Sequence, residues 1–427
     1  MKIVADPNIP FVREAFGSLG EVTLIPGRQM SAATVRDATV LLVRSVTPVN
    51  ASLLDGSRVQ FVATATIGTD HVDTAWLAAR RIGFASAAGS NANSVAEYVT
   101  AAMLELGRRH GFRLRNKTLG VVGIGNVGSK VVHCANALGM RVLANDPPLE
   151  RLAGRRAESD ESSPTEPSLR DGAAVCAKSG HANPHAVSPA ATPTAPSVAH
   201  PETRRAGASP TDRFVSLDRV IAEADFITLH VPLTKSGPDA TRHLLDPLRL
   251  DRRPILINSS RGAVLDNPAL LQAIDNKKLA GCVLDVWEGE PNLLPGLLAK
   301  TDLGTPHIAG YSFDGKVNGA RMIHEAACRF LGIAPAWQPQ LPLPAVPRIA
   351  VDVGRDEDEE EVLRRVIASV YDIIADDAAL RRAGSAGFDK LRAEYPIRRE
   401  FFNTAVTLRG ASESLRAKFT ALGFRVE

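Results

Sequence analysis

The sequence contains few cysteines, little net charge and no long apolar run. Its four cysteines among 427 residues, Cys134, Cys176, Cys282 and Cys328, show neither a disulfide nor a metal spacing, which favours a reducing cytoplasm. The formal net charge of +3 is small for this length, so we expect no nucleic-acid or acidic-membrane partner. No apolar segment approaches the roughly 20 residues that span a bilayer. Residues 1–6 lack the apolar core of a signal peptide, and we expect none.

Two segments lack the residues of a folded core. Residues 150–213 contain no aromatic residue and no isoleucine, and they are rich in Ala, Pro, Ser, Thr and His, which predicts a disordered insertion in a surface loop. His181, His185 and His200 accompany Cys176 there, but their spacing fits no known metal pattern, so we predict no metal site. Residues 335–347 are Pro-rich and are predicted to be a linker.

The remaining sequence alternates short apolar runs with helical patterns, which is typical of parallel sheets covered by helices. A chain of 427 residues is also too long for one ordinary core, so we expect two or three domains. The predicted strands of the first unit are Lys2–Ala5, Val22–Ile25, Val40–Val43, Phe61–Ala65 and Ile82–Ala85. This unit has no Gly-x-Gly-x-x-Gly motif, so we do not place the nucleotide site on it.

A helix is predicted from Ser94 to about Arg108, with Ser94 as its N-cap and Glu97 as the capping-box partner. The alternation resumes after the insertion and continues to a helix ending at about Phe330. Beyond the linker, acidic residues at 356–361 are predicted to begin an amphipathic helix, because carboxylates at a helix N-terminus favour the helix dipole.

A glycine motif follows the strand predicted at 118–122. Gly123 permits a tight turn, Gly125 lets the backbone approach a pyrophosphate, and Gly128 lets the following helix pack closely against the strand. Asp146 lies 18 residues after Gly128, at the end of the next predicted strand. A carboxylate there accepts from the ribose hydroxyls and repels a 2′-phosphate, so the pattern favours NAD over NADP.

Three residues at the ends of later strands suit hydride chemistry on a 2-hydroxy acid. His307 suits the base because a histidine both accepts and donates a proton near neutral pH. Arg261 suits a carboxylate clamp, since its planar fork binds a carboxylate bidentately. Glu290 suits the partner of the imidazole, and Asp285 is expected to meet the nicotinamide or its ribose. Each residue alone also allows a structural role; their combination after a nucleotide fold favours catalysis.

These motifs resemble those of the D-isomer-specific 2-hydroxyacid dehydrogenases. The resemblance covers the chain except the insertion and rests on residues 43–47, 64–73, the glycine loop, 145–148, 261–264, 284–291 and 307–311. It implies that Arg261 and Glu290 are active-site residues and that His307 is the proton donor in the reductive direction. It further implies substrate contacts by Ser45, Thr66 and Tyr311, and NAD contacts by Asn126, Val127, Asp146, Asp285 and Gly310. Val231 stands where the family often has Thr, so a hydroxyl contact to NAD is lost.

The resemblance implies an α/β fold with three parts. We predict a flavodoxin-like α/β substrate domain at 1–93, completed by about 308–334, and a Rossmann-type doubly wound parallel-sheet NAD domain at 94–307. A small α+β C-terminal domain at 348–427 is predicted to make a homodimer, with regulatory ligand binding as the alternative. The expected substrate is a small phosphorylated 2-hydroxy acid. Two alternatives stay open: another 2-hydroxyacid dehydrogenase, for example one acting on phosphoglycerate, and an NADH-sensing corepressor.

Overall fold

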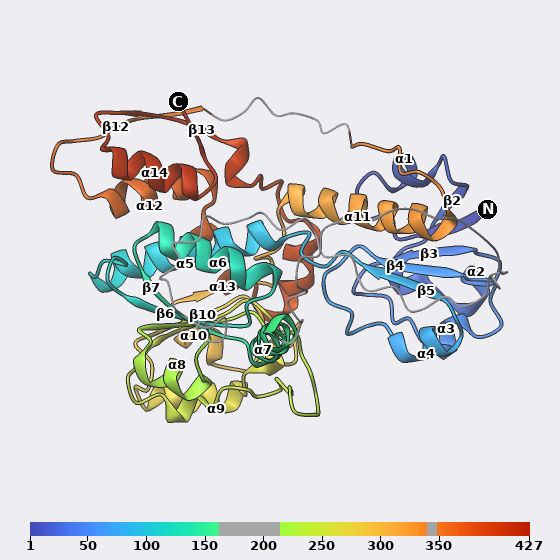
Figure 1. The fold of residues 1–427 in the computed structure, drawn as a ribbon, viewed down its shortest axis with the longest axis horizontal. Helices are drawn as coiled ribbons and strands as arrows, with labels where there is room; N and C mark the ends of the chain where they lie inside the picture. Colours follow the sequence, from blue (N-terminus) through green and yellow to red (C-terminus); the bar gives the residue numbers. More distant parts are fainter. Residues whose placement is uncertain (162–213, 340–347) are drawn as a thin grey trace, which may run out of the picture. The chain divides into compact units, whose positions relative to one another are not determined.

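The computed structural model describes residues 1–161, 214–339 and 348–427. The N-terminal part contains a five-stranded parallel sheet in the order β2-β1-β3-β4-β5 (Figure 1), which is the strand order of flavodoxin. The strands are β1 Lys2–Ala5, β2 Glu21–Leu24, β3 Val40–Val43, β4 Phe61–Thr64 and β5 Gly83–Ser86. Their positions confirm the strands predicted there to within one or two residues.

Short helices connect these strands, and one long helix from later in the chain joins them. The connecting helices are α1 Val12–Phe16, α2 Ala32–Val35, α3 Ala51–Leu54 and α4 Thr74–Ala79. The long helix α11, Phe313–Leu331, packs against β4 and β5. Its Ala320, Ile323 and Ala327 are buried in the same core as Ile3 and Leu42. A helix that lies some 220 residues later in the chain therefore covers part of the N-terminal sheet.

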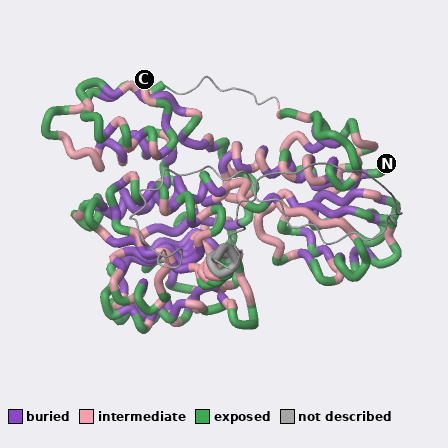
Figure 2. The backbone as a smooth tube through the Cα atoms, in the orientation of Figure 1, coloured by how far each residue is buried: buried purple, intermediate pink, exposed green. Residues whose placement is uncertain are grey.

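The second sheet has six parallel strands in the order β11-β10-β9-β8-β6-β7. These are β6 Thr118–Val122, β7 Arg141–Asn145, β8 Phe226–Leu229, β9 Ile255–Asn258, β10 Gly281–Leu284 and β11 Leu303–Gly304. Every residue of β8, β9 and β10 is buried (Figure 2), as expected for central parallel strands covered on both faces. The helices of this part are α5 Ala92–His110, α6 Asn126–Ala137, α8 Leu217–Glu223, α9 Asn267–Asp275 and α10 Leu297–Lys300.

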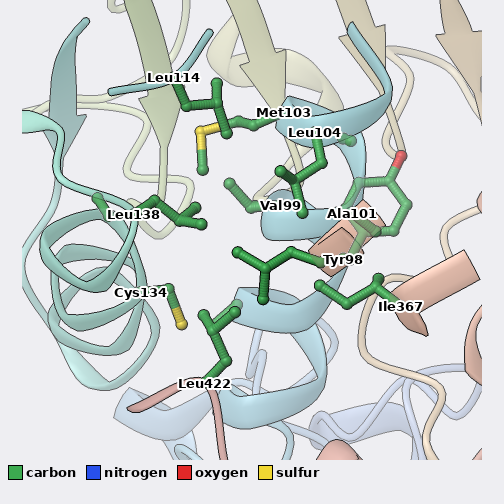
Figure 3. Packing of buried hydrophobic residues seen from close by; sticks show 14 of the residues in the cluster. Tyr98, Val99, Ala101, Met103, Leu104, Leu114, Cys134, Leu138, Ile367 and Leu422 are labelled. Atoms are coloured by element: carbon green, nitrogen blue, oxygen red, sulfur yellow. The ribbon is translucent and has the colours of Figure 1, made fainter. Parts of the chain in front are cut away.

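Helix α5 is the most buried helix of this part. Its Val99 and Met103 lie on the side of Cys134 of α6 and of Leu138 at the end of that helix (Figure 3), in one core that also includes C-terminal residues. The predicted start of this helix is wrong, because α5 begins at Ala92 and Ser94 lies inside it. Tertiary partners take both side chains of the expected capping box: Ser94 Oγ donates to the carbonyl of Ala309 at 2.7 Å, and Glu97 Oε1 accepts from the amide of Phe401 at 2.7 Å.

The predicted insertion begins later than expected. Helix α7 runs from Pro147 to Glu161, so disorder starting at residue 150 is wrong for its first twelve residues. Residues 162–213, with the predicted disorder and the four His and Cys side chains considered for a metal, lie outside the described residues, as do 340–347 of the linker. Where the described chain resumes, the amide of Val215 donates to the carbonyl of Ala144 on β7 at 2.8 Å.

The C-terminal part corrects one class prediction. Its strands β12 Arg348–Asp352, β13 Ala405–Arg409 and β14 Arg425–Val426 form a wholly parallel sheet, and parallel neighbours require crossover connections. The helices α12 Glu359–Val370, α13 Ile373–Ala393 and α14 Glu413–Ala421 supply those crossovers, so this part is α/β rather than α+β. The acidic run begins α12 as predicted, with Asp358 as N-cap accepting from Glu361 N.

Helix α13 reaches back to the six-stranded sheet. Its Leu380 and Phe388 are buried in one core with Trp287 and Leu297. Its Asp377 Oδ1 accepts from the amide of Gly304 on the edge strand β11 at 2.7 Å. None of the described helices is long and apolar enough to cross a membrane.

Candidate active site

A cavity of about 600 Å³ gathers most of the predicted site residues. Segments following β3, β4, β8, β9, β10 and β11 line it, as expected where the carboxyl ends of parallel strands meet. The predicted residues on its wall are Ser45, Thr66, Asn126, Val127, Val231, Arg261, Asp285, Glu290, His307, Gly310 and Tyr311. Gly123, Gly125, Gly128 and Asp146 do not line it; they lie in the turn after β6 and at the end of β7.

His307 and Glu290 lie in direct contact, as the sequence predicts for a histidine and its carboxylate partner. His307 Nδ1 lies 2.5 Å from Glu290 Oε1. Burial opposes ionisation of Glu290, but the adjacent His307 and the amide of Trp287 hold the pKa of this carboxyl below its ordinary value. An ionised carboxylate fixes the proton of the imidazole on Nδ1, which leaves Nε2 to exchange a proton with a ligand.

Asp285 organises the backbone beside His307. The carboxylate is almost completely buried and accepts from Thr305 Oγ1 at 2.6 Å, Ile308 N at 2.7 Å and Ala309 N at 3.0 Å. Burial raises the pKa of Asp285, and these donors partly offset that effect. The backbone of His307 itself is left-handed, at φ 57°. Asp285 therefore stabilises the loop that carries the proposed base.

Arg261 faces the same cavity but already has partners. Its Nε donates to Asp70 Oδ2 at 2.9 Å and its Nη1 donates to the carbonyl of Ser260 at 2.7 Å. A β-carbon placed on Gly68 would lie 1.8 Å from Arg261 Nη2. A carboxylate that binds the Nε–Nη2 edge bidentately therefore has to replace Asp70, and the absence of a side chain at residue 68 leaves room for the guanidinium.

Gly68→Ala is expected to raise KM for a 2-hydroxy acid about 10- to 100-fold, since the methyl group displaces Arg261 and hydrogen bonds to a charged group are each worth about 1.5–3 kcal/mol. Steady-state kinetics and a thermal melt check it, because the displaced atom ends a flexible side chain and the fold should survive. Gly354→Ala is the matched control, as its added methyl would meet only Glu357, with Cβ at 3.7 Å and Oε2 at 3.9 Å. An unchanged KM would contradict the clamp.

The glycine loop fits a dinucleotide. Gly123 has φ 90°, and a β-carbon on Gly128 would lie 1.9 Å from the carbonyl oxygen of Gly123, so neither residue accepts a side chain without rearrangement. A β-carbon on Gly125 would meet no atom within 4 Å, which leaves space at the start of α6 for a pyrophosphate. Asp146 Oδ2 accepts from Ile124 N at 2.8 Å, which places the acid at the glycine turn.

Two cavity residues absent from the sequence predictions present unpaired polar atoms. Asn91 Nδ2 donates to the carbonyl of Gly310 at 3.2 Å, whereas Asn91 Oδ1 is buried without a partner among the described residues. Ser259 Oγ is buried and equally unpaired within that part of the chain. Buried polar atoms normally have partners, so these two suit the polar groups of a bound ligand. Asn91 is the N-cap residue of α5, a position that we had predicted for Ser94.

Two family models match the chain. Residues 82–170 and 191–309 match the D-isomer specific 2-hydroxyacid dehydrogenase, NAD binding domain, and residues 341–423 match a domain of unknown function. Solved structures share the fold. A D-lactate dehydrogenase from Aquifex aeolicus, complexed with NAD and lactic acid, has a TM-score of 0.54 at 21% identity and covers 78% of this chain and 96% of its own. The NAD⁺-bound 3-phosphoglycerate dehydrogenase of Entamoeba histolytica has a TM-score of 0.55 at 20% identity, covering 78% and 95%.

The fold, the glycine loop and the match to the family model thus define an NAD-dependent D-isomer-specific 2-hydroxyacid dehydrogenase. Curated relatives narrow this class. The erythronate-4-phosphate dehydrogenase of Edwardsiella ictaluri is 43% identical over 99% of both chains, and that of Salinibacter ruber is 43% identical over 94% of this chain and 92% of its own. The chain belongs to the erythronate-4-phosphate dehydrogenase family.

Proposed function

We propose that this chain oxidises 4-phospho-D-erythronate at C2 with NAD to (R)-3-hydroxy-2-oxo-4-phosphobutanoate, in pyridoxal 5′-phosphate biosynthesis. The observation that carries the proposal is the His307–Glu290 pair, which faces one cavity together with Arg261. The family membership supplies the substrate, since relatives covering nearly the whole chain are named for erythronate 4-phosphate.

The chain's own residues have separate tasks in this reaction. Bound NAD supplies the hydride acceptor. His307 takes the C2 hydroxyl proton at Nε2, and Glu290 stabilises the resulting imidazolium through Nδ1. Arg261 binds the substrate carboxylate after exchanging its contact with Asp70. Ser45, Thr66 and Tyr311 contact the rest of the substrate from the cavity wall.

Cofactor contacts are proposed on both sides of the glycine loop. The first N–H groups of α6, at Asn126 and Val127, hold the pyrophosphate, since a helix leaves these donors without partners of its own. Asp146 holds the adenosine ribose. Val231 contributes backbone contacts only, and Asp285 and Gly310 lie toward the nicotinamide.

A substrate panel with NAD and NADP tests the proposed function. We expect turnover of 4-phospho-D-erythronate with NAD, weaker turnover with NADP, and kcat/KM at least tenfold lower with 3-phosphoglycerate and D-lactate. Preference for 3-phosphoglycerate would point to another 2-hydroxyacid dehydrogenase. Lack of turnover with every 2-hydroxy acid, together with NADH-dependent binding of a partner protein, would point instead to a corepressor.

We propose the three-domain organisation given by the sequence, with the C-terminal part forming a homodimer. Two large apolar side chains between α13 and β13 support this, because Ile397 is 74% exposed and Phe402 is 41% exposed. An exposed apolar patch is a common mark of an interface between subunits.

Ile397→Asp is expected to shift the chain from dimer toward monomer, because a carboxylate in an apolar interface loses hydration without gaining a partner. Analytical ultracentrifugation at micromolar concentration measures the shift. Ile333→Asp, which alters another exposed isoleucine, serves as the control for solubility. A wild-type chain that sediments as a monomer would remove the dimer proposal.

A further inference from the structure

The wall of the active-site cavity carries more positively charged than negatively charged side chains that are available to a ligand. Among its charged lining residues, the three acids are already engaged: Asp70 with Arg261, Glu290 with His307, and Asp285 with backbone and hydroxyl donors. None of these carboxylates contacts the other cations on the wall through a hydrogen bond or ion pair found in the described residues.

Those other cations are Arg44 after β3, Lys316 on α11 and Arg392 on α13. Within the described part of the chain neither Arg44 nor Lys316 forms an ion pair. Arg392 has one weak ion pair in this part of the chain: its Nη1 lies 3.7 Å from Asp389 Oδ1, and that carboxylate is 53% exposed. The Nε of Arg392 is buried and has no hydrogen-bond partner among described residues. Three cations thus converge on the cavity with little local compensation.

The ring of Tyr311 is close to two of these cations. Lys316 Nζ is 4.5 Å from the centre of its ring, and Arg392 Cζ is 5.6 Å from the same centre. Burial, followed by repulsion from Arg44, Arg398 and Arg392, lowers the pKa of Lys316 to about 8. A bound anion would relieve this repulsion among the cations.

We propose that Arg44, Lys316 and Arg392 form the subsite for the substrate's phosphate group, and that Arg392 makes the C-terminal segment part of the active site. The inference rests on the proposed function and extends it by naming the residues that distinguish a phosphorylated from an unphosphorylated 2-hydroxy acid. A phosphate monoester carries nearly two negative charges and several acceptor oxygens at neutral pH, which matches an unpaired cluster of Arg and Lys.

Contacts before and after Arg392 in the sequence hold this part of the chain in place. Upstream, before the break in α13 at Gly384, Arg381 pairs with Asp377 at 2.8 Å and donates to the carbonyl of Leu298 at 2.7 Å. Beyond the break, Phe388 is buried in the core that contains Trp287. Downstream, Arg399 forms a buried bidentate pair with Asp314 next to the start of α11. Arg399 follows α13 and Asp314 lies in the first turn of α11, so this ion pair ties the segment after α13 to the helix that carries Lys316.

The test compares 4-phospho-D-erythronate with D-erythronate in wild type, Arg392→Met and Lys316→Met. We expect each variant to lose about 10- to 100-fold in kcat/KM with the phosphorylated substrate and less than threefold with D-erythronate. Lys390→Met is the matched control, since it removes an exposed cation from the same helix α13 without touching the cavity, and it should preserve the preference. Lys316→Arg should restore most of the loss.

The outcomes separate the two proposals. Wild type without activity on 4-phospho-D-erythronate would overturn the proposed function. Wild-type activity with an equal loss on both substrates in the Met variants would overturn the phosphate subsite and assign the two residues a structural role. Inorganic phosphate gives an independent readout: it should inhibit turnover of 4-phospho-D-erythronate competitively in wild type, and about tenfold more weakly in Arg392→Met.

A pH series adds a second discrimination. The groups that face Lys316 are Tyr311 beside it, Arg44 after β3, and Arg392 and Arg398 in the C-terminal segment. Because Lys316 is charged below pH about 8 and neutral above it, KM for 4-phospho-D-erythronate should rise above that pH in wild type. The rise should be absent in Lys316→Met, and a rise of equal size there would contradict the assignment.

Discussion

His307→Ala is expected to reduce kcat by roughly 10²–10⁴-fold while leaving the affinity for NADH nearly unchanged, because a general base contributes that much and the nucleotide is held elsewhere. Nε2 of His307 is the atom that the Glu290 contact leaves available to the substrate. Single-turnover absorbance of NADH measures the chemical step, and fluorescence titration measures binding. His110→Ala provides a control on a histidine outside the cavity.

Glu290→Gln should give a smaller loss than His307→Ala, since the amide still orients the ring but no longer stabilises the imidazolium. The rising limb of the kcat/KM pH profile for oxidation should shift toward lower pH in this variant, because loss of the Glu290 carboxylate destabilises the imidazolium and the base form of His307 is then present at lower pH. Near-normal turnover in His307→Ala with intact NADH binding would refute the assignment of the base.

Asp285→Ala is expected to destabilise the protein on the order of 3 kcal/mol, because it leaves three buried donors without an acceptor. The lost charge offsets part of this, since burial of Asp285 is itself unfavourable and raises its pKa. The amides of Ile308 and Ala309 should become mobile, and with them the neighbouring His307. Both the unfolding midpoint in urea and kcat should therefore fall together.

Thr305→Val is the graded control for Asp285, because it removes one of the three donors and preserves the shape of the side chain. It also leaves Tyr98 OH without its partner at 2.9 Å, so a loss of about 1–2 kcal/mol is expected. If Asp285→Ala were as stable as wild type, the carboxylate would have a purely ligand-binding role.

The elements that the sequence predicted well are those encoded locally. Strands such as Lys2–Ala5 and Val40–Val43 match their predicted bounds, because a buried parallel strand is a short apolar run between turn residues. The glycine loop is equally local. The sequence also predicted that Arg261, Glu290 and His307 lie close together, because each follows a strand and parallel strands bring the loops after them to one edge of the sheet.

The predictions that failed depend on distant partners. Ser94 looked like a helix cap, yet its hydroxyl bonds to a residue 215 positions later. The C-terminal sheet is parallel because of crossovers that no local pattern specifies. Arg392 carries no local sign of an active-site role: it is one more cation on an amphipathic helix, and only the packing of α13 brings it to the cavity.

The contact between Asp377 and Gly304 has a practical consequence. Strand β11 is the edge of the six-stranded sheet, and exposed edges recruit strands from other molecules. Asp377 occupies the Gly304 amide, and Arg381 donates to the carbonyl of Thr301 beside it at 2.8 Å. A chain shortened at the linker would lose both contacts and leave this edge open. Attempts to isolate the nucleotide-binding half by truncation should therefore yield aggregates, whereas keeping α13 attached should yield a monodisperse fragment.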